Sequence, residues 1–283
     1  MAASVTEPTA PAPRPAVRGH GRVRRAGGGV NLLGLGVIVV LVVAWQLLVG
    51  AGVVNEDALP TPTDIWHGFR YLAGKDGGLW EAVRHTVGVV LLAWAIGAVL
   101  GGLLGVVLTL NRGVASWTNA TVDLLRSLPV VAFIPIAIIV WGTGSKTEIV
   151  LGAYSALWPM LINTAGGVRD IPPRLHDVAR TMRLSPLAKL TKVILPATGS
   201  AMLVGARLSL AATLVICVVA EMLGLQSGIG NQLVLEQSAN QPARMWVYVL
   251  TTGVLGIGVN FGLVWLFRLV LPGVAAVAER RAG

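Results

Sequence analysis

Long apolar stretches separated by short polar ones dominate the chain from residue 32 to residue 271. A helix needs about 20 apolar residues to cross the hydrocarbon core of a bilayer. Six stretches approach that length, at residues 32–54, 86–110, 124–142, 149–168, 201–225 and 246–271. Because lipid offers the backbone no hydrogen-bond partners, such stretches form helices. The pattern predicts an all-α, polytopic membrane helix bundle of about six transmembrane helices.

The third stretch, 124–142, is interrupted by Arg126, Pro129 and Pro135. Prolines are tolerated in a membrane helix when neighbouring helices satisfy the freed backbone groups. We therefore expect this span to be packed inside the bundle.

Two local patterns refine the bundle. In the polar segment 55–85, apolar residues recur at helical spacing from Ile65 to Leu72, which predicts a short amphipathic helix on the extracytoplasmic surface. In the second span, Gly97, Gly101 and Gly105 recur every four residues. Such a stripe of small residues predicts the close approach of another helix.

The distribution of basic residues predicts the orientation. With the N-terminus inside, the cytoplasmic segments 1–31, 111–123, 169–200 and 272–283 hold fourteen Lys and Arg, and the external segments hold five. Basic residues stay on the cytoplasmic side of membrane proteins, so both termini are expected in the cytoplasm. Residues 1–31 are rich in Pro, Gly and Arg and predict a disordered basic tail, and 272–283 a second cytoplasmic tail.

Composition supports a membrane protein over a soluble one. The chain is 54% hydrophobic and 12% charged, with a mean hydropathy of +0.74. Its net charge of +9 comes from basic residues that lie between the apolar stretches and not on one polar surface. We therefore expect lipid around the chain and no nucleic acid partner.

The cytoplasmic loop 169–200 carries a double helical pattern. After Pro172, which is placed to start a helix, apolar residues at Leu175, Val178, Ala179 and Met182 share one face. Such a face on the cytoplasmic side has no hydrocarbon to bury it, and a groove on a cytoplasmic partner would do so.

A second short helix is predicted to follow within the loop. Ser185 reads as its N-cap, and Leu187 lies on its apolar face. Because Leu195 precedes Pro196, the helix is expected to stop there. The loop is thus predicted to hold two short helices joined by a turn.

The same loop resembles the coupling loop of binding-protein-dependent ABC importer permeases, whose pattern is EAA, three residues, G, nine residues, IxLP. This chain reads DVARTMR at 177–183 and VILP at 193–196, with matching spacing. Asp177, Val178 and Arg183 depart from the pattern. The family glycine at position 183 suits a turn with positive φ, which a side chain disfavours.

The resemblance covers roughly residues 58–271. The strings LPTP at 59–62, LRSLP at 125–129, FIP at 133–135 and AEMLG at 220–224 look like the nitrate, sulfonate and taurine branch of these permeases. It implies the type I importer architecture with a permease core at 86–271. It also implies a second permease copy, a cytoplasmic ATPase dimer that binds ATP and Mg, an extracytoplasmic substrate-binding protein, and a cell-membrane location.

The resemblance also implies which residues couple the permease to its ATPase. They are Leu175, Asp177, Val178, Ala179, Met182, Arg183, Leu187, Leu195 and Pro196. Two alternatives stay open: a permease of another ABC importer branch, and a membrane scaffold that recruits a partner without transport.

Polar residues within the spans are candidates for the pathway or a gate, because burying them in lipid is costly. Asn163, Thr164 and Glu221 are such candidates, although helix–helix hydrogen bonds or a position near the water interface would also explain them. Arg207 is expected to extend to the lipid headgroups.

Catalytic chemistry is not predicted. The predicted spans contain no paired acids, and the four histidines lack metal-ligand spacing, so we expect no enzyme activity, no metal site and no cofactor bound by this chain. The string GSKT at 144–147 lacks the glycine before the lysine of a phosphate-binding loop. We therefore expect ATP to bind a partner subunit.

Overall fold

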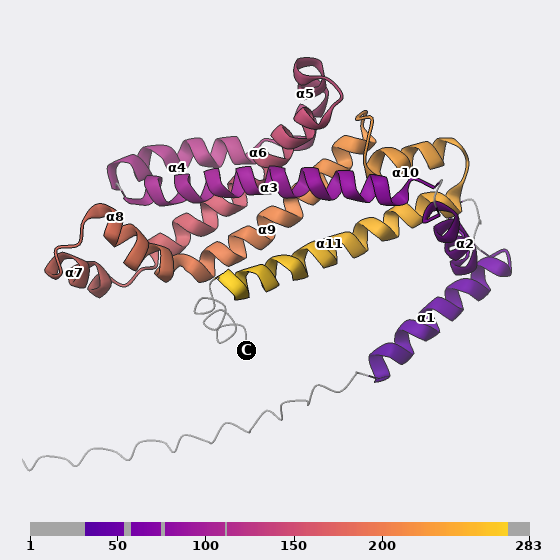
Figure 1. Cartoon of the computed structure of the whole chain (residues 1–283), viewed down its shortest axis with the longest axis horizontal. Helices are drawn as coiled ribbons and strands as arrows, with labels where there is room; N and C mark the ends of the chain where they lie inside the picture. The colour runs from indigo at the N-terminus through magenta and orange to yellow at the C-terminus, as the bar shows by residue number, and fades with distance from the viewer. Residues whose placement is uncertain (1–31, 54–57, 75–76, 111, 271–283) are drawn as a thin grey trace, which may run out of the picture. The chain divides into compact units, whose positions relative to one another are not determined.

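The computed structural model describes residues 32–53, 58–74, 77–110 and 112–270, and regular structure in these ranges is helical, with no strand (Figure 1). The helices are α1 (Leu32–Gly50), α2 (Pro62–Leu72), α3 (Leu79–Leu110), α4 (Arg112–Ser127), η1 (Val130–Phe133), α5 (Ile134–Trp141), α6 (Ser145–Arg169), α7 (Pro173–Thr181), α8 (Pro186–Lys189), η2 (Leu190–Ile194), α9 (Leu195–Met222), α10 (Ile229–Ser238) and α11 (Pro242–Val270). The chain divides after Val43 into two parts, and the packing below lies within Ala44–Gly283. The predicted tails 1–31 and 272–283 lie outside the described residues.

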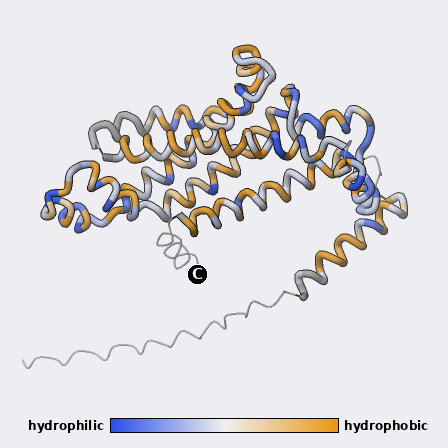
Figure 2. Tube along the Cα trace, viewed as in Figure 1, coloured by the Kyte–Doolittle hydropathy of each residue, from blue (hydrophilic) through white to orange (hydrophobic). Residues whose placement is uncertain are grey.

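Four helical runs are long and apolar enough to cross a membrane: Leu79–Thr109, Ser145–Arg169, Pro186–Met222 and Pro242–Phe267. Figure 2 shows their hydrophobic character along the trace. They confirm the second, fourth, fifth and sixth predicted spans. Each begins earlier than predicted, because a hydropathy pattern marks only the apolar part of a helix, while the backbone hydrogen bonds continue into its polar ends.

The third predicted span is broken. Ala120–Ser127 and Val130–Trp141 are bent by 69° at the break, and they make a fifth span if they cross as a pair. The bend falls at Pro129, which has no N–H to continue the hydrogen-bond ladder. The span packs into the bundle on one side only in the single chain, because Ile134 and Ala137 are buried in the core whereas Ile139 is 84% exposed.

The first predicted span, 32–54, forms α1, which ends at Gly50. Its apolar part, Gly36–Gly50, is shorter than the other spans.

The amphipathic helix predicted in the following segment is confirmed as α2. It is capped by Thr61, whose hydroxyl accepts a hydrogen bond from the backbone N of Asp64 at 3.2 Å. Arg244 of α11 lies 4.0 Å from the ring centre of Tyr71 of α2, which joins these two helices.

Helices α3, α6 and α9 form the centre of the bundle, and the glycine stripe of α3 explains its close approach to α6. A Cβ atom at Gly97 would overlap the backbone oxygen of Ala153 on α6, and one at Gly105 would overlap that of Leu161. The predicted close helix approach is confirmed, with α6 as the partner.

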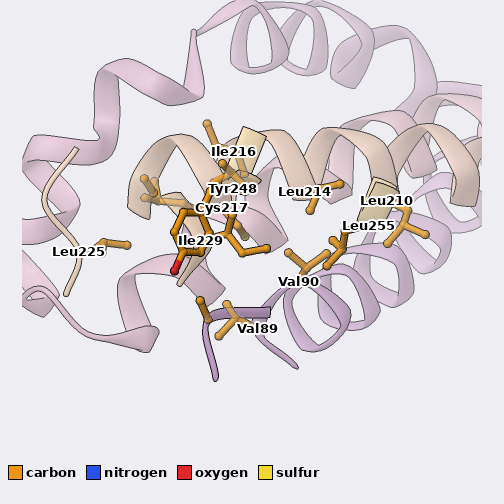
Figure 3. Close-up of a cluster of buried hydrophobic side chains, with 14 of the residues drawn as sticks. Val89, Val90, Leu210, Leu214, Ile216, Cys217, Leu225, Ile229, Tyr248 and Leu255 are labelled. Atoms are coloured by element: carbon orange, nitrogen blue, oxygen red, sulfur yellow. The ribbon is translucent and has the colours of Figure 1, made fainter. Parts of the chain in front are cut away.

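The hydrophobic core brings α11 and α10 onto this centre. Figure 3 shows Tyr248 of α11 beside Cys217 of α9 and Ile229 of α10. All three side chains are fully buried. This packing fixes the end of the bundle at which α9 finishes and α10 begins.

Candidate functional site

The predicted coupling loop, 169–200, begins as the sequence indicates. Pro172 occupies the N-cap position of α7, and the helix starts at Pro173. The Ser185 hydroxyl accepts a hydrogen bond from the backbone N of Ala188 at 3.3 Å and so caps α8. Both predicted helix starts are confirmed.

The second helix of the loop differs from the prediction, because it does not stop at Leu195 and Pro196. The π-helical turn η2 leads directly into α9, so Pro186–Met222 is one helical run. Pro196 lies in the first turn of α9, next to a π turn that already departs from the regular ladder, where a missing N–H is tolerated. The loop therefore has one separate short helix, α7, and a second that continues into a membrane span.

Helix α7 exposes an apolar face in the single chain. Val178 is 52% exposed and Met182 is 65% exposed, and Leu175 is exposed beside them. Leu187 of α8 is 70% exposed. Ala179, which the pattern placed on the same face, is buried instead, because it lies on the side of α7 that turns toward α8. Exposed apolar residues grouped in this way are typical of an interaction surface.

A groove of about 760 Å³ lies between α7 and the start of the next helix. Its lining includes three basic side chains, Arg180, Arg183 and Lys189. A basic rim beside an apolar face favours a partner that presents acidic groups.

The turn after α7 has the conformation that the family pattern predicts for a glycine. Arg183 has a φ of +47°. Its backbone N bonds the oxygen of Arg180 at 2.9 Å, and the N of Leu184 bonds the oxygen of Ala179 at 3.1 Å. These two bonds form a Schellman motif, in which the residue after the helix is left-handed. Asp177 and Val178, the two other departures from the pattern, are both exposed.

The loop is anchored to the bundle by a small hydrophobic cluster. Ile194, which is 1% exposed, packs with Val106 of α3 and with Val168 and Ile171 at the end of α6. A displacement of the loop would therefore be transmitted to the ends of α3 and α6 as well as along α9.

Glu221 lies in the interior at the other end of α9. It is 1% exposed, and its Oε1 accepts a hydrogen bond from the Thr86 hydroxyl at 2.7 Å. Its Oε2 accepts one from the backbone N of Gly230 at 2.8 Å. The Thr86 hydroxyl also accepts one from the backbone N of Ile229 at 3.0 Å. This carboxylate joins α3, α9 and α10 within the chain.

Sequence reasoning missed two residues beside Glu221. Glu148 of α6 is 1% exposed, and its Oε2 lies 3.9 Å from Nδ1 of His85 on α3. The statement that the spans contain no paired acids is wrong, because α6 and α9 each bring a buried glutamate to this place. Both residues fell just outside the predicted spans, at 85 and 148. The signal that could have indicated Glu148 is an acidic residue at the start of a helix in an otherwise apolar chain.

The remaining pathway candidates lie on α6. Asn163 is partly buried, and its Nδ2 donates a hydrogen bond to the backbone oxygen of Pro159 in the same helix at 2.7 Å. Thr164 is fully buried, and a Cβ at Gly105 of α3 would overlap it. In the single chain Thr164 therefore lies in the contact between α3 and α6.

A second groove, of about 840 Å³, lies between α9 and α11. Arg207 is exposed and is the charged residue of its lining, which also includes the polar side chains of Thr252 and Asn260. A cation and two hydrogen-bonding groups thus lie along an otherwise apolar channel between two membrane helices.

A bundle of apolar helices with an exposed helical loop of this pattern is typical of a membrane transport subunit. The family of binding-protein-dependent transport system inner membrane components matches residues 97–276, and the chain belongs to this family. It is an ABC importer permease of the binding-protein-dependent type.

Similar proteins share this class. The SsuC permease protein of Bacillus subtilis (strain 168), named for aliphatic sulfonates transport, is 30% identical, over 77% of this chain and 78% of its own. The bicarbonate transport system permease protein CmpB of Synechococcus elongatus is 28% identical, over 85% and 89%. The nitrate import permease protein NrtB of that organism is 25% identical, over 81% and 85%.

Among solved structures, a chain of the inward-facing MetNI methionine ABC transporter matches with a TM-score of 0.55 and 18% identity. The match covers 67% of this chain and 99% of that one. It shows the fold, which is that of a type I ABC importer permease, as the sequence predicted.

Proposed function

We propose that this permease imports a small anion and that the exposed apolar face of α7 docks onto a cytoplasmic ATPase. The observation that carries the proposal is the exposure of Val178, Met182 and Leu187 on a loop anchored to three membrane helices. Burying these side chains in a partner groove would stabilise the assembly, and the anchored loop would pass the partner's movement to the bundle.

The proposed topology follows from charge. Basic residues are concentrated in the segments 1–31, 111–123, 169–200 and 272–283, which supports a cytoplasmic location for both termini and the coupling loop of a cell-membrane protein. The opposite ends of the helices then face the extracytoplasmic substrate-binding protein.

The proposed partners divide the chemistry. ATP and Mg²⁺ bind the two ATPase subunits, which hydrolyse the nucleotide, and the permease supplies the pathway. A second copy of the permease completes that pathway. The exposed apolar residues of the broken span, such as Ile136 and Ile139, are available to that copy or to lipid.

The proposed substrate is a small oxyanion or organic anion of the nitrate or sulfonate kind. The similar permeases named for sulfonates, nitrate and bicarbonate support it, since all three of these solutes are anions. The groove that contains Arg207, Thr252 and Asn260 has the charge and hydrogen-bonding groups that such an anion needs.

Co-purification tests the docking surface. Full-length permease is co-expressed with its ATPase, and recovery of the ATPase is compared for the wild type, Val178→Asp/Met182→Asp and the matched control Val178→Ala/Met182→Leu. We expect the Asp variant to lose the ATPase while the control retains it, because two charges would be buried in the interface.

Recovery of the ATPase with the Asp variant at the wild-type level would contradict the docking proposal. An assembled wild-type complex that moves no solute would instead favour the scaffold alternative. Import of a cationic or peptide solute would favour a permease of another importer branch.

A further inference from the structure

Three ionisable side chains from three helices meet at one end of the bundle. His85 of α3, Glu148 of α6 and Glu221 of α9 offer ligand atoms that all lie within 4.8 Å of one another. Both carboxylates are 1% exposed, and the His85 side chain is 25% exposed. The imidazole is thus the most solvent-accessible side chain of the cluster, although its Nδ1 atom is buried.

No lysine or arginine among the described residues balances the two carboxylates of this cluster by an ion pair. Two buried carboxylates in a low-dielectric interior are costly without a neighbouring positive charge. A group that supplies positive charge would therefore stabilise the folded chain.

Two atoms of the cluster are buried without any hydrogen-bond partner among the described residues: Oε2 of Glu148 and Nδ1 of His85. They face each other at 3.9 Å, which is too long for a hydrogen bond. Ligand bonds to Zn²⁺ of about 2.0–2.2 Å, meeting at one ion, place ligand atoms about 3–4 Å apart. The separation of this pair therefore lies in the range that a shared metal ion requires, and Glu221 offers a carboxylate oxygen within 4.8 Å of both atoms.

We propose that His85, Glu148 and Glu221 bind one divalent transition-metal ion of the Zn²⁺ class. Two carboxylates would neutralise its charge, a neutral imidazole would supply the nitrogen ligand, and a water molecule would complete the four-coordinate set. The imidazole favours Zn²⁺ over Mg²⁺ or Ca²⁺, which prefer oxygen ligands.

The surroundings of Glu221 support this role. The Thr86 hydroxyl and the Gly230 amide each donate a hydrogen bond to one of its oxygens, which fixes the orientation of the carboxylate. A carboxylate oxygen that accepts one hydrogen bond retains a second lone pair for a metal. The bound ion would tie α3, α6 and α9 together. This proposal does not depend on the proposed function.

Metal content and a spectroscopic probe test the site. Untagged full-length permease, purified with its partner subunits, is freed of metal with a chelator and titrated with Zn²⁺. We expect one Zn²⁺ per permease chain to remain after desalting and to raise the unfolding temperature. Co²⁺ in place of Zn²⁺ is expected to give the visible absorption of a low-symmetry, four-coordinate ion.

Glu148→Gln keeps the size of the side chain and removes one ligand charge, and His85→Gln removes the nitrogen ligand at a partly exposed position. Each is expected to weaken Zn²⁺ affinity at least about tenfold. His67→Gln, at an exposed histidine on α2, is the matched control and should bind as the wild type does.

The proposal is overturned if the wild-type chain retains no Zn²⁺ or if both ligand variants bind it as tightly as the wild type. Because the wild-type titration and the Co²⁺ spectrum need no variant, a misfolded variant would not obscure the result.

Discussion

Thr86 and Glu221 lie 135 residues apart in the sequence and form a buried hydrogen bond of 2.7 Å between α3 and α9. The same threonine hydroxyl accepts a bond from the backbone N of Ile229, at the start of α10. One small side chain therefore satisfies a buried carboxylate and a helix N-terminus together.

Thr86→Val should destabilise the permease, because it keeps the side-chain shape and leaves two buried polar groups without this partner. We expect a loss of about 2–4 kcal/mol in the free energy of unfolding. Chemical unfolding in detergent measures it, with Thr86→Ser as the control that keeps the hydroxyl. Equal stability of the Val and Ser variants would show that the hydrogen bonds contribute little.

Gly101→Ala should destabilise the contact between α3 and α6, since the added Cβ would overlap the backbone oxygen of Leu157. The expected cost is about 1–3 kcal/mol. Gly88→Ala in the same helix is the matched control, because nothing lies within 4 Å of its added Cβ. The unfolding temperature should fall for Gly101→Ala and not for Gly88→Ala. An unchanged unfolding temperature for Gly101→Ala would mean that α3 and α6 are further apart.

Arg183→Gly should stabilise the turn after α7, because the left-handed backbone at this position disfavours a side chain by about 1–2 kcal/mol. Slower hydrogen exchange of the α7 amides would report the gain. Arg180→Gly, one turn earlier in the helix, should have the opposite effect, with a cost of about 1 kcal/mol. Faster exchange in both variants would contradict the assigned turn.

Arg207→Gln should lower anion uptake if the groove between α9 and α11 is part of the pathway. Uptake is expected to fall at least about tenfold, equivalent to ~1.4 kcal/mol, while the assembled complex still hydrolyses ATP. Arg207→Lys keeps the charge and should retain most of the uptake. Unchanged uptake by the Gln variant would mean that this arginine only reaches the lipid headgroups.

The fold could be predicted largely from the apolar stretches, because lipid leaves the backbone no alternative to helices. The ends of α3 and α6 could not, since a helix continues beyond its apolar part. The predicted spans therefore began one residue after His85 and Glu148, so these two residues were not considered as buried groups. No sequence spacing could have joined them to Glu221, because the three residues come from different helices.

In the predicted coupling loop, 169–200, features with a local cause could be predicted, and features that depend on packing could not. The helix starts at Pro172 and Ser185 follow from local backbone chemistry, and the structure has both. The positive φ at Arg183 corresponds to the glycine of the family pattern, although its side chain disfavours that conformation. The burial of Ala179 depends on packing within the loop. The continuation of helix past Pro196 depends on a π turn that the sequence does not signal.

If α7 couples ATP hydrolysis to import, a change to its exposed apolar residues must stop transport. ATP-driven uptake of labelled nitrate and of an alkanesulfonate is measured with the complete complex, reconstituted in vesicles with the binding protein. Val178→Asp/Met182→Asp is expected to abolish uptake, whereas Val178→Ala/Met182→Leu is expected to preserve it. Uptake by the Asp variant at the wild-type rate would show that α7 does not couple hydrolysis to import.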